Sequence, residues 1–565
     1  MRQSIVYTVT ANCQDCYRCL RACPVKAIRV SGGQARIEDN LCIQCGTCVH
    51  ECPQRAKKIR SDLEGVKKLL ESGRAVAASV APSFAAAFGD GAAGRLPAML
   101  RGLGFRHVAE TAEGAKYITE KSFGRGVPGN VCTACPAVVN YIEKYRPDLL
   151  EHLIPVVSPM IAHGRKLKMR HTGCAVVFIG PCAAKKEEAL RPENREAVDF
   201  VLTFEELEQW LREENITPEL CSGREFDRDD RIGDARLFPL EGGMLKTGGL
   251  ESDPSVKGVL CVSGADEVIS LLADSNTMRA VQYIEPLFCK GGCIGGPAFP
   301  DGKTMFERRG KVIDYWQDKP EGGGLDSLEV FHTASFSPKP AAGDNPPENQ
   351  VNNILEKMGK LDPAFQLNCG ACGYKTCLEN AVAVAGGMAE AEMCIAYTRR
   401  LAQQRTDRII DTTPNGVVIL DGELRMIQMN PAFQKMFTCN NGILGRRISY
   451  LLNADGFEAL QAGSAETYES IQTKYGVRYH EILYGLRDEE QYVGIYSDIS
   501  KIGYDANQLD VIKAQTLMHA REFLEHQVRF AQEMAHYLGK STARSEEIAK
   551  KLIDLYEESE TGEPR

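Results

Sequence analysis

Short apolar runs alternate with amphipathic segments through the middle of the chain. The runs Val76–Val80, Ala175–Ile179 and Gly258–Val262 each precede a Gly/Pro turn, and helical patterns separate them. Buried strands that alternate with helices are typical of a parallel sheet in an α/β domain. The pattern therefore predicts an α/β domain over residues 61–335.

Different patterns follow towards the C-terminal end. Residues 398–502 show hairpin-like alternation, as in Gly416–Leu420 and Tyr492–Tyr496, which favours an α+β domain. Residues 503–565 are helical in pattern. Their apolar positions recur at sevens, at Leu517, Leu524, Ala531 and Leu538. Two interpretations of this seam stay open: a helix packed on its own domain, or a homodimer interface that relays a signal.

Composition limits the class of protein. A length of 565 residues predicts three to five domains, and a net charge of −9 argues against a broad nucleic-acid-binding surface. No apolar run is long enough to span a membrane, and the first residues lack the core of a signal peptide. We therefore expect a soluble, cytoplasmic, multidomain protein. Its Pro/Gly-rich segment 336–360 is predicted to be a linker.

The 21 cysteines point to metal ligation rather than to disulfides, because they form tight groups in a long chain without an export signal. In residues 1–60 the pattern C-x2-C-x2-C-x3-C-P occurs twice, 29 residues apart. Three cysteines of one repeat and the last cysteine of the other would bind each cubane. The first set is Cys13, Cys16, Cys19 and Cys52, and the second is Cys42, Cys45, Cys48 and Cys23. The repeat resembles a bacterial two-[4Fe–4S] ferredoxin, and a pair of structural zinc sites is the alternative.

Three later segments carry cysteines beside Gly and Pro, at residues 131–137, 178–188 and 284–297. Four thiolates from these segments can close around one cluster, and the glycines let the backbone approach it. The segments resemble the three signature motifs of [FeFe] hydrogenases. The resemblance implies an H-cluster, a [4Fe–4S] cubane joined to a two-iron subcluster with CO, cyanide and a dithiolate bridge. Its implied ligands are Cys135, Cys182, Cys289 and Cys293.

The same resemblance implies roles for further residues. Cys293 would bridge the two parts of the H-cluster, and Lys185 would contact a cyanide. The turn Ala81-Pro82-Ser83 would lie near the other cyanide, and Gly242 and Gly243 would lie beside the carbonyl ligands. Two alternatives stay open: the four cysteines could hold only a cubane, and Lys185 could be a solvated surface charge.

Three positions depart from the pattern of fast hydrogenases. Ala134 replaces the cysteine that first accepts the proton, and a methyl group cannot relay one. Gly180 and Leu287 each replace a methionine. Cys132 could act in place of the missing thiol, but it lies two residues away. We therefore expect slow turnover, with Lys185, Cys293 and Ala134 as the positions that decide the catalytic chemistry.

A second cysteine module follows the linker. Cys369, Cys372, Cys377 and Cys394 have the spacing C-x2-C-x4-C…C and resemble a single-[4Fe–4S] module, with zinc as the alternative. Beyond it, residues 411–421 and 429–433 resemble a PAS domain; an unrelated α+β packing module is the alternative. The predicted order is therefore a two-cluster domain (1–60), an H-cluster domain (61–335), a linker (336–360), a one-cluster module (361–397), a PAS domain (398–502) and a helical tail (503–565).

Three functions are compatible with this organisation. The first is a sensory [FeFe] hydrogenase that reacts with H2 and protons, relays electrons through three accessory [4Fe–4S] clusters and signals to a separate phosphatase, kinase or regulator. The second is a metabolic hydrogenase that exchanges electrons with a soluble carrier. The third is an iron–sulfur redox sensor without the two-iron subcluster. Nucleic-acid and membrane partners are not expected, and a homodimer is.

Overall fold

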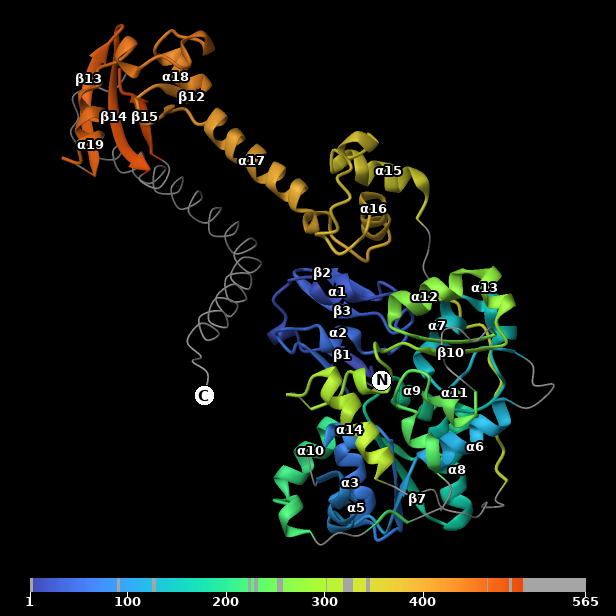
Figure 1. Ribbon diagram of the computed structural model, residues 1–565. Helices are drawn as coiled ribbons and strands as arrows, with labels where there is room; N and C mark the ends of the chain where they lie inside the picture. The colour runs from blue at the N-terminus through green and yellow to red at the C-terminus, as the bar shows by residue number, and fades with distance from the viewer. Residues whose placement is uncertain are drawn as a thin grey trace, which may run out of the picture. The chain divides into compact units, whose positions relative to one another are not determined.

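Figure 1 shows the computed structural model of the chain, which divides into two compact units, Met1–Cys394 and Ile395–Arg565. The structure describes residues 4–88, 92–123, 129–221, 225–227, 232–250, 258–300, 302–318, 329–341, 346–464, 466–486 and 490–500. The predicted helical seam of the tail lies outside these residues. Within them, no helix combines the length and the apolar character that a bilayer crossing needs.

The N-terminal cysteine repeat folds as a pseudo-symmetric pair. Strand β1 (Val6–Thr8) pairs antiparallel with β4 (Lys57–Ile59), and β2 (Ile28–Ser31) pairs antiparallel with β3 (Gln34–Ile37). Helices α1 (Arg18–Ala22) and α2 (Thr47–His50) carry the third cysteine of each repeat. Left-handed backbone recurs at the same 29-residue spacing as the cysteines, at Asp15 and Gln44, Tyr17 and Gly46, and Lys26 and Arg55. The sequence repeat is thus also a repeat of backbone conformation.

A four-stranded parallel sheet forms the centre of the first unit, in the order β6–β5–β7–β8. Its strands are β5 (Val76–Val80), β6 (His107–Glu110), β7 (Ala175–Gly180) and β8 (Phe200–Thr203). Every residue of β5 and β7 is buried, as expected for strands covered on both faces. The structure confirms the predicted α/β fold class.

Short helices surround this sheet. They are α3 (Leu63–Glu71), α4 (Phe84–Ala87), α5 (Ala92–Gly102), α6 (Ala112–Ser122), α7 (Pro136–Tyr145), α8 (Pro159–Arg170), α9 (Ala184–Leu190), α10 (Phe204–Glu213), α11 (Gly243–Thr247), α12 (Ala265–Ala273), α13 (Ser275–Ala280) and α14 (Met305–Gln317). A separate parallel pair, β9 (Val259–Ser263) and β10 (Tyr283–Leu287), lies beside them. The segment before α7 joins this pair through a parallel bridge between Val131 and Ile284.

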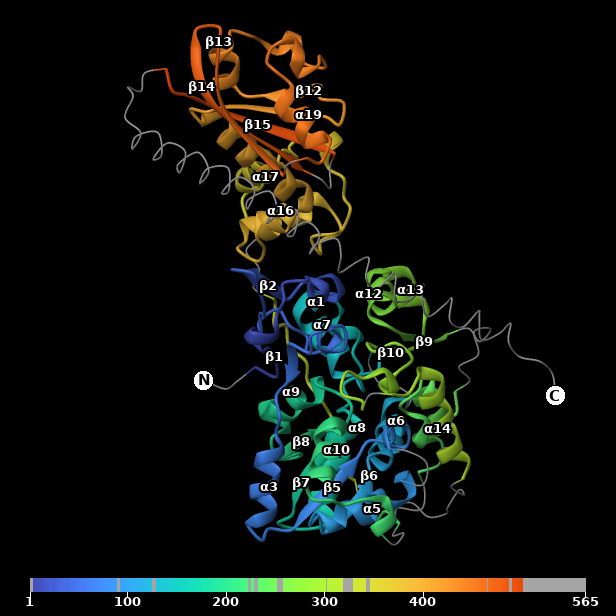
Figure 2. The same cartoon turned by 90° about the vertical axis from the view of Figure 1, so that its left-hand side faces the viewer.

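The segment predicted as a linker differs from that prediction in its second half. Residues 348–357 form helix α15 (Glu348–Lys357), which packs Val351 and Leu355 against Ala381 of α16 (Cys377–Ala385). The apolar positions of α15 are few, so the composition of the segment resembles that of a linker. Its few apolar residues nevertheless share one face, and burial of that face against α16 stabilises the helix. Figures 1 and 2 both show the N-terminal repeat between α16 and the central sheet.

The second unit begins with helix α17 (Ile395–Thr412) and contains one antiparallel sheet. The strand order is β12–β11–β15–β14–β13, with β11 (Gly416–Leu420), β12 (Met426–Met429), β13 (Thr467–Lys474), β14 (Val477–Leu486) and β15 (Gln491–Asp498). Helices α18 (Pro431–Met436) and α19 (Asp455–Gln461) complete the core together with buried Phe433, Phe437 and Tyr496. Buried Asn430 caps α18 by accepting the N–H of Phe433.

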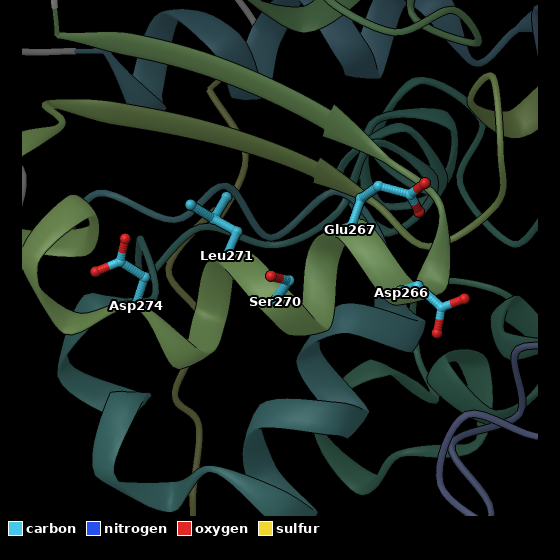
Figure 3. Close-up of a pocket in the computed structure, with 5 residues that line it drawn as sticks. All are labelled: Asp266, Glu267, Ser270, Leu271 and Asp274. Carbon is cyan, nitrogen blue, oxygen red and sulfur yellow. The ribbon is translucent and has the colours of Figure 1, made fainter. Parts of the chain in front are cut away.

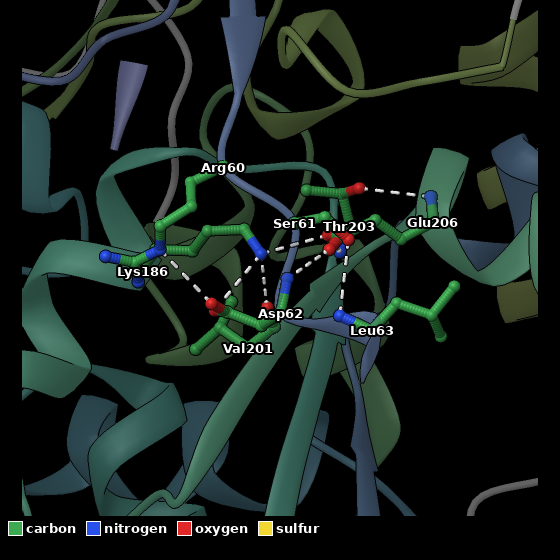
Figure 4. Close-up of polar contacts among 8 residues, drawn as sticks. All are labelled: Arg60, Ser61, Asp62, Leu63, Lys186, Val201, Thr203 and Glu206. Atoms are coloured by element: carbon green, nitrogen blue, oxygen red, sulfur yellow. Dashed lines mark hydrogen bonds and ion pairs between the residues drawn. The ribbon is translucent and has the colours of Figure 1, made fainter. Parts of the chain in front are cut away.

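A buried lysine joins four elements of the first unit (Figure 4). Lys186 of α9 is almost fully buried, and its Nζ donates to Val201 O of β8 at 2.6 Å and to Glu206 Oε2 of α10 at 2.9 Å. It also donates to Asp62 Oδ2, which precedes α3, at 3.2 Å. Glu206 in turn accepts the N–H of Asp62 at 2.7 Å. This network ties the edge of the sheet to two helices that cover it.

Replacing Lys186 with Met is expected to lower the free energy of unfolding by roughly 3–5 kcal/mol, because the largely buried carboxylate of Glu206 loses its cation, whereas Asp62 keeps its ion pair with Arg60. Thermal or denaturant melting of the full chain followed by circular dichroism measures the loss. Lys67→Met is the matched control, since Lys67 of α3 pairs with exposed Glu213 of α10 at 2.8 Å. Equal destabilisation by the two variants would contradict the assigned role of Lys186.

The network also predicts an acid-sensitive stability. Burial acts to raise the pKa of Glu206, but the Lys186 charge and the hydrogen bonds it accepts outweigh burial and hold that pKa below its usual value of 4.5. A carboxyl group with a lowered pKa in the folded state stabilises the fold at neutral pH. This contribution is expected to fade as the pH falls below about 4.5, and stability measured in Glu206→Gln should lack that part of the pH dependence.

Candidate metal centres

Two groups of cysteine thiols come together in the N-terminal repeat. Burial raises the pKa of the Cys19 thiol, and the charges of three further cysteines, Cys16, Cys13 and Cys52, raise it more. The charge of Lys57 opposes this shift. Burial likewise raises the pKa of Cys48, and Cys45, Cys42 and Cys23 add to it. The last cysteine of each repeat therefore lies with the first three cysteines of the other. Thiols in such surroundings become thiolates when a metal binds them.

Four further thiols converge in the central domain. Burial raises the pKa of Cys289 well above its usual value, and the charges of Cys182, Cys135 and Cys293 raise it further. For Cys182, burial and then Cys135 raise the pKa to about 11. For Cys293, burial, Cys135 and Cys182 raise it to about 12. The structure thus brings together four cysteines that are up to 158 residues apart in the sequence, between positions 135 and 293.

Parallel strands position these loops. Cys182 follows the carboxyl end of β7, and Cys289 follows that of β10. Cys135 is the N-cap of α7, which Pro136 opens at its first position. Glycine lets the loops interlock, because a Cβ on Gly296 would lie 2.8 Å from Pro181 O and one on Gly292 would lie 2.3 Å from Pro239 O. The carboxyl ends of parallel strands are a common place for ligand sites in α/β proteins.

Of the two adjacent lysines in the second motif, only Lys185 faces the four thiols. Its Nζ donates to Glu188 Oε2 at 2.8 Å and to the backbone O of Ala134 at 3.3 Å. Its charge opposes the raised pKa values of Cys182 and Cys293. The residue is 8% exposed, so the alternative of a solvated surface charge is wrong. Lys186 points away from the site into the network of Figure 4.

The Ala81–Ser83 turn lies against the second motif. The N–H of Ala81 donates to Ile179 O at 2.9 Å, and a Cβ on Gly180 would lie 3.1 Å from the Ala81 Cβ. Ser83 is 1% exposed, and its hydroxyl has no hydrogen-bond partner among the described residues. Pro82 holds the turn between these two residues. A buried hydroxyl without a partner is suited to a polar group bound beside it.

The glycine pair lies beside the third motif, because Leu240 bridges Gly292. Gly242 has a φ of +79° and caps α11, and a Cβ on Gly243 would lie 2.0 Å from Leu237 O. These two positions therefore require glycine for the local backbone packing, whatever else they contact.

The three departures from the hydrogenase pattern have different surroundings. Ala134 offers its carbonyl to Lys185, so the backbone at this position contacts the site while the side chain holds no titratable group. Gly180 has no room for a side chain, since a Cβ would lie 2.7 Å from the Phe178 ring. Leu287 is 5% exposed at the end of β10. Burial keeps Cys132 protonated by raising its pKa, and Glu285 adds to this effect.

The cysteine motifs do not point to Glu285, a carboxyl group in the wall of this site. It is 2% exposed in β10 and accepts the N–H of Met244 at 3.2 Å and that of Leu245 at 3.1 Å. Burial raises its pKa to about 7, although the two N–H groups oppose the shift. The signal in the sequence is a single acidic residue within an apolar strand, Tyr-Ile-Glu-Pro-Leu.

The C-terminal cysteine module forms a fourth group of thiols. Burial raises the pKa of Cys372, and Cys394 and Cys369 add to it. Cys377 opens α16, and Lys360 Nζ donates to its Sγ at 3.1 Å. One turn later, Asn380 is buried, and both polar atoms of its side chain have no partner among the described residues. The donor set and these unpaired atoms fit a bound iron–sulfur cluster.

Packing makes the N-terminal repeat a neighbour of both the four central thiols and the C-terminal module. A Cβ on Gly46 would lie 2.4 Å from Pro297, the last residue of the third motif. Burial and then the charge of Cys23 raise the pKa of Cys45, and the charge of Cys135 raises it further. Helix α7 holds the same loop, since Asn140 donates to Ile43 O at 3.1 Å. On the other side, burial raises the pKa of Tyr374, and both Cys372 and Cys23 add to it. Tyr374 therefore lies between the module and the N-terminal repeat.

The depression that Figure 3 shows is separate from these groups. It lies on α12 and is lined by Asp266, Glu267, Ser270, Leu271 and Asp274. Asp274 caps α13 by accepting the N–H groups of Asn276 and Thr277. A smaller cavity of about 170 Å³ lies closer to the four central thiols, because Thr133, Pro136 and Glu188 line it.

Four family models match successive parts of the chain. The iron only hydrogenase large subunit, C-terminal domain, matches residues 74–297, and the 4Fe-4S dicluster domain matches residues 5–53. A family described as an Fe-S cluster matches residues 366–396, and the PAS domain matches residues 404–471.

Curated relatives include hydrogenases and assembly factors. The chain is 25% identical over 336 residues to the NADP-reducing hydrogenase subunit HndD of Solidesulfovibrio fructosivorans, covering 47% of this chain and 57% of the relative. It is 26% identical to the periplasmic [Fe] hydrogenase large subunit of Nitratidesulfovibrio vulgaris, covering 47% and 86%. It is 34% identical over 129 residues to the cytosolic Fe-S cluster assembly factor NAR1 of Kluyveromyces lactis, covering 20% and 28%. The chain thus spans 57% of HndD and 28% of NAR1.

A solved structure also aligns with part of the chain. An [FeFe]-hydrogenase HydA1 of Chlamydomonas reinhardtii aligns with a TM-score of 0.39 at 17% identity, covering 50% of this chain and all of that one. By the four family matches alone, the chain carries an iron-only hydrogenase large-subunit domain, joined to a 4Fe-4S dicluster domain, a further iron–sulfur module and a PAS domain.

Proposed function

We propose that this chain is an [FeFe] hydrogenase of slow turnover that senses H2 or redox state and passes the signal through its PAS domain to a separate regulator. The observation that carries the proposal is the convergence of Cys135, Cys182, Cys289 and Cys293 beside the buried cation of Lys185.

The residues of the site would hold the H-cluster and control its surroundings. When bound, the H-cluster supplies the interconversion of H2 with two protons and two electrons. The four cysteines, Cys293 among them, would hold its iron. Lys185 would present its ammonium group to an anionic ligand, while Glu188 fixes the position of that group. Ser83 would offer its unpaired hydroxyl to a polar group of the bound cluster.

Slow turnover follows from Ala134. Proton transfer by a positioned side chain contributes typically 10²–10⁴-fold to a rate, and Ala134 has no group that titrates. A sensor needs only enough turnover to change its own redox state, so this loss is compatible with sensing. The accessory site formed by Cys42, Cys45, Cys48 and Cys23 would carry electrons between the central site and the Cys369 module, with Tyr374 beside the last step.

Partners and location complete the proposal. A separate phosphatase, kinase or regulator would receive the signal, a soluble carrier could exchange electrons, and the helical tail would form a homodimer in the cytoplasm. The relative HndD is a subunit of an NADP-reducing hydrogenase, which keeps a metabolic role as an alternative. The similarity to NAR1 favours a second candidate, an iron–sulfur protein without the two-iron subcluster.

Infrared spectroscopy of anaerobically matured protein tests the central site. CO and cyanide bands are expected under argon, and they should shift under H2. Cys293→Ser should lose the bands because it removes a ligand, whereas Cys261→Ser, a cysteine outside the four groups, should keep them. If no bands appear while a control hydrogenase matures normally, the chain is a multi-cluster redox protein and the second candidate holds.

Ala134→Cys tests the cause of the slow turnover. The new thiol would supply a proton-accepting group at the position that lacks one, so H2 evolution with a reduced dye should rise by about 100-fold. Ala134→Val is the matched control, because it adds bulk without a titratable group. A rate that does not differ between the two variants and the parent chain would refute the proton-relay argument.

A further inference from the structure

Lys360 reaches the C-terminal module from the end of the helix that replaces the predicted linker. Gly359 has a φ of +64°, and the N–H of Lys360 donates back to Leu355 O at 2.7 Å, which ends α15. Leu355 itself packs against α16, the helix that Cys377 opens. The turn after α15 therefore directs Lys360 towards the thiols of the module.

The surroundings of Lys360 are unusual for a lysine. The residue is 5% exposed, and its Nζ donates to Cys377 Sγ at 3.1 Å and also hydrogen-bonds the Cys394 thiol. Within the described part of the chain no carboxylate forms an ion pair with it; Cys377 and Cys394 are the groups that its ammonium contacts. The nearby Lys357 differs, because it is exposed on α15.

A buried ammonium group needs a compensating anion, since removing an unpaired charge from water costs several kcal/mol. Two neutral thiols would not supply that anion. Cys377 and Cys394 supply it when they are thiolates, which is their state as ligands of iron. The burial of Lys360 and the ligation of these two cysteines therefore stabilise each other.

We infer that Lys360 is a positioning residue of the module's iron–sulfur cluster, which it holds through hydrogen bonds to two ligand thiolates and whose reduction it favours. A cation beside the ligands stabilises the reduced cluster more than the oxidised one, because the reduced cluster carries one more negative charge. The inference depends on a cluster in the module and not on the reaction with H2. No lysine hydrogen-bonds exposed Cys369 or Cys372 among the described interactions, and Lys26 acts on Cys372 through its charge alone.

A redox titration of the full chain, followed by electron paramagnetic resonance, tests this inference. In Lys360→Met one reductive transition should move to a lower potential. The reduction equilibrium constant should fall at least tenfold, which corresponds to about 59 mV for a one-electron transition. The other transitions should stay in place. Lys357→Met removes the same charge three residues away, at an exposed position, and should leave every transition unchanged.

Three results would overturn the inference: no transition moves in Lys360→Met, Lys357→Met moves the same transition equally, or Lys360→Arg behaves like Lys360→Met. If Lys360→Met instead loses one cluster's worth of iron and one transition, Lys360→Arg distinguishes the causes. Recovery of iron and of the transition by Lys360→Arg supports the inference, and failure to recover them contradicts it. The infrared bands of the central site report the proposed function separately, so the two can fail independently.

Discussion

The burial of closely grouped cysteine thiols is the constraint on which the rest of this structure depends. Each group of cysteines is drawn from separate segments into the protein interior, where burial and neighbouring thiolates both raise the pKa values of the thiols. A lysine lies near each group of thiols. Lys57 acts on Cys19 and Cys48, Lys185 on Cys182 and Cys293, and Lys360 on Cys377. All three lysines are at most 8% exposed.

Close backbone packing turns these separate groups into a series. Gly46 allows Pro297 to pack directly on the second cysteine loop of the repeat, and Gly373 of the module, at a φ of +96°, packs on Leu20. Arg21 adds a hydrogen bond from the repeat to Ala371 O at 3.1 Å. Tyr374, Ala389 and Met393 of the module share one apolar core with the N-terminal repeat. The order of the sites is therefore fixed by side-chain packing within one compact unit.

The central site matches the hydrogenase motifs at the cysteines but differs from them at several neighbouring side chains. The four cysteines, Lys185 and the glycine packing match the hydrogenase motifs, whereas Ala134, Gly180 and Leu287 are departures from them. At Ala134 the backbone carbonyl still accepts from Lys185 at 3.3 Å, so loss of a side-chain thiol leaves the position of the lysine intact. At Gly180 the Phe178 ring occupies the space that a longer side chain would need. Chemistry at this site can thus change without a change of fold.

The sequence alone determined the kinds of site and the fold class. The cysteine spacings, the short apolar runs and the two-residue alternation after residue 398 are local patterns, and local patterns predict strands, loops and ligand motifs. The tertiary structure decided what depends on contacts between distant segments. It distinguished Lys185 from Lys186, since only packing shows which ammonium group faces the thiols and which pairs with Glu206. It placed Glu285 in the site wall, and it made α15 a helix because α16 covers its apolar face. Lys360 stood in a segment whose composition is that of a linker, and its role followed only when folding buried its charge beside two cysteines that lie 17 and 34 residues further along the chain.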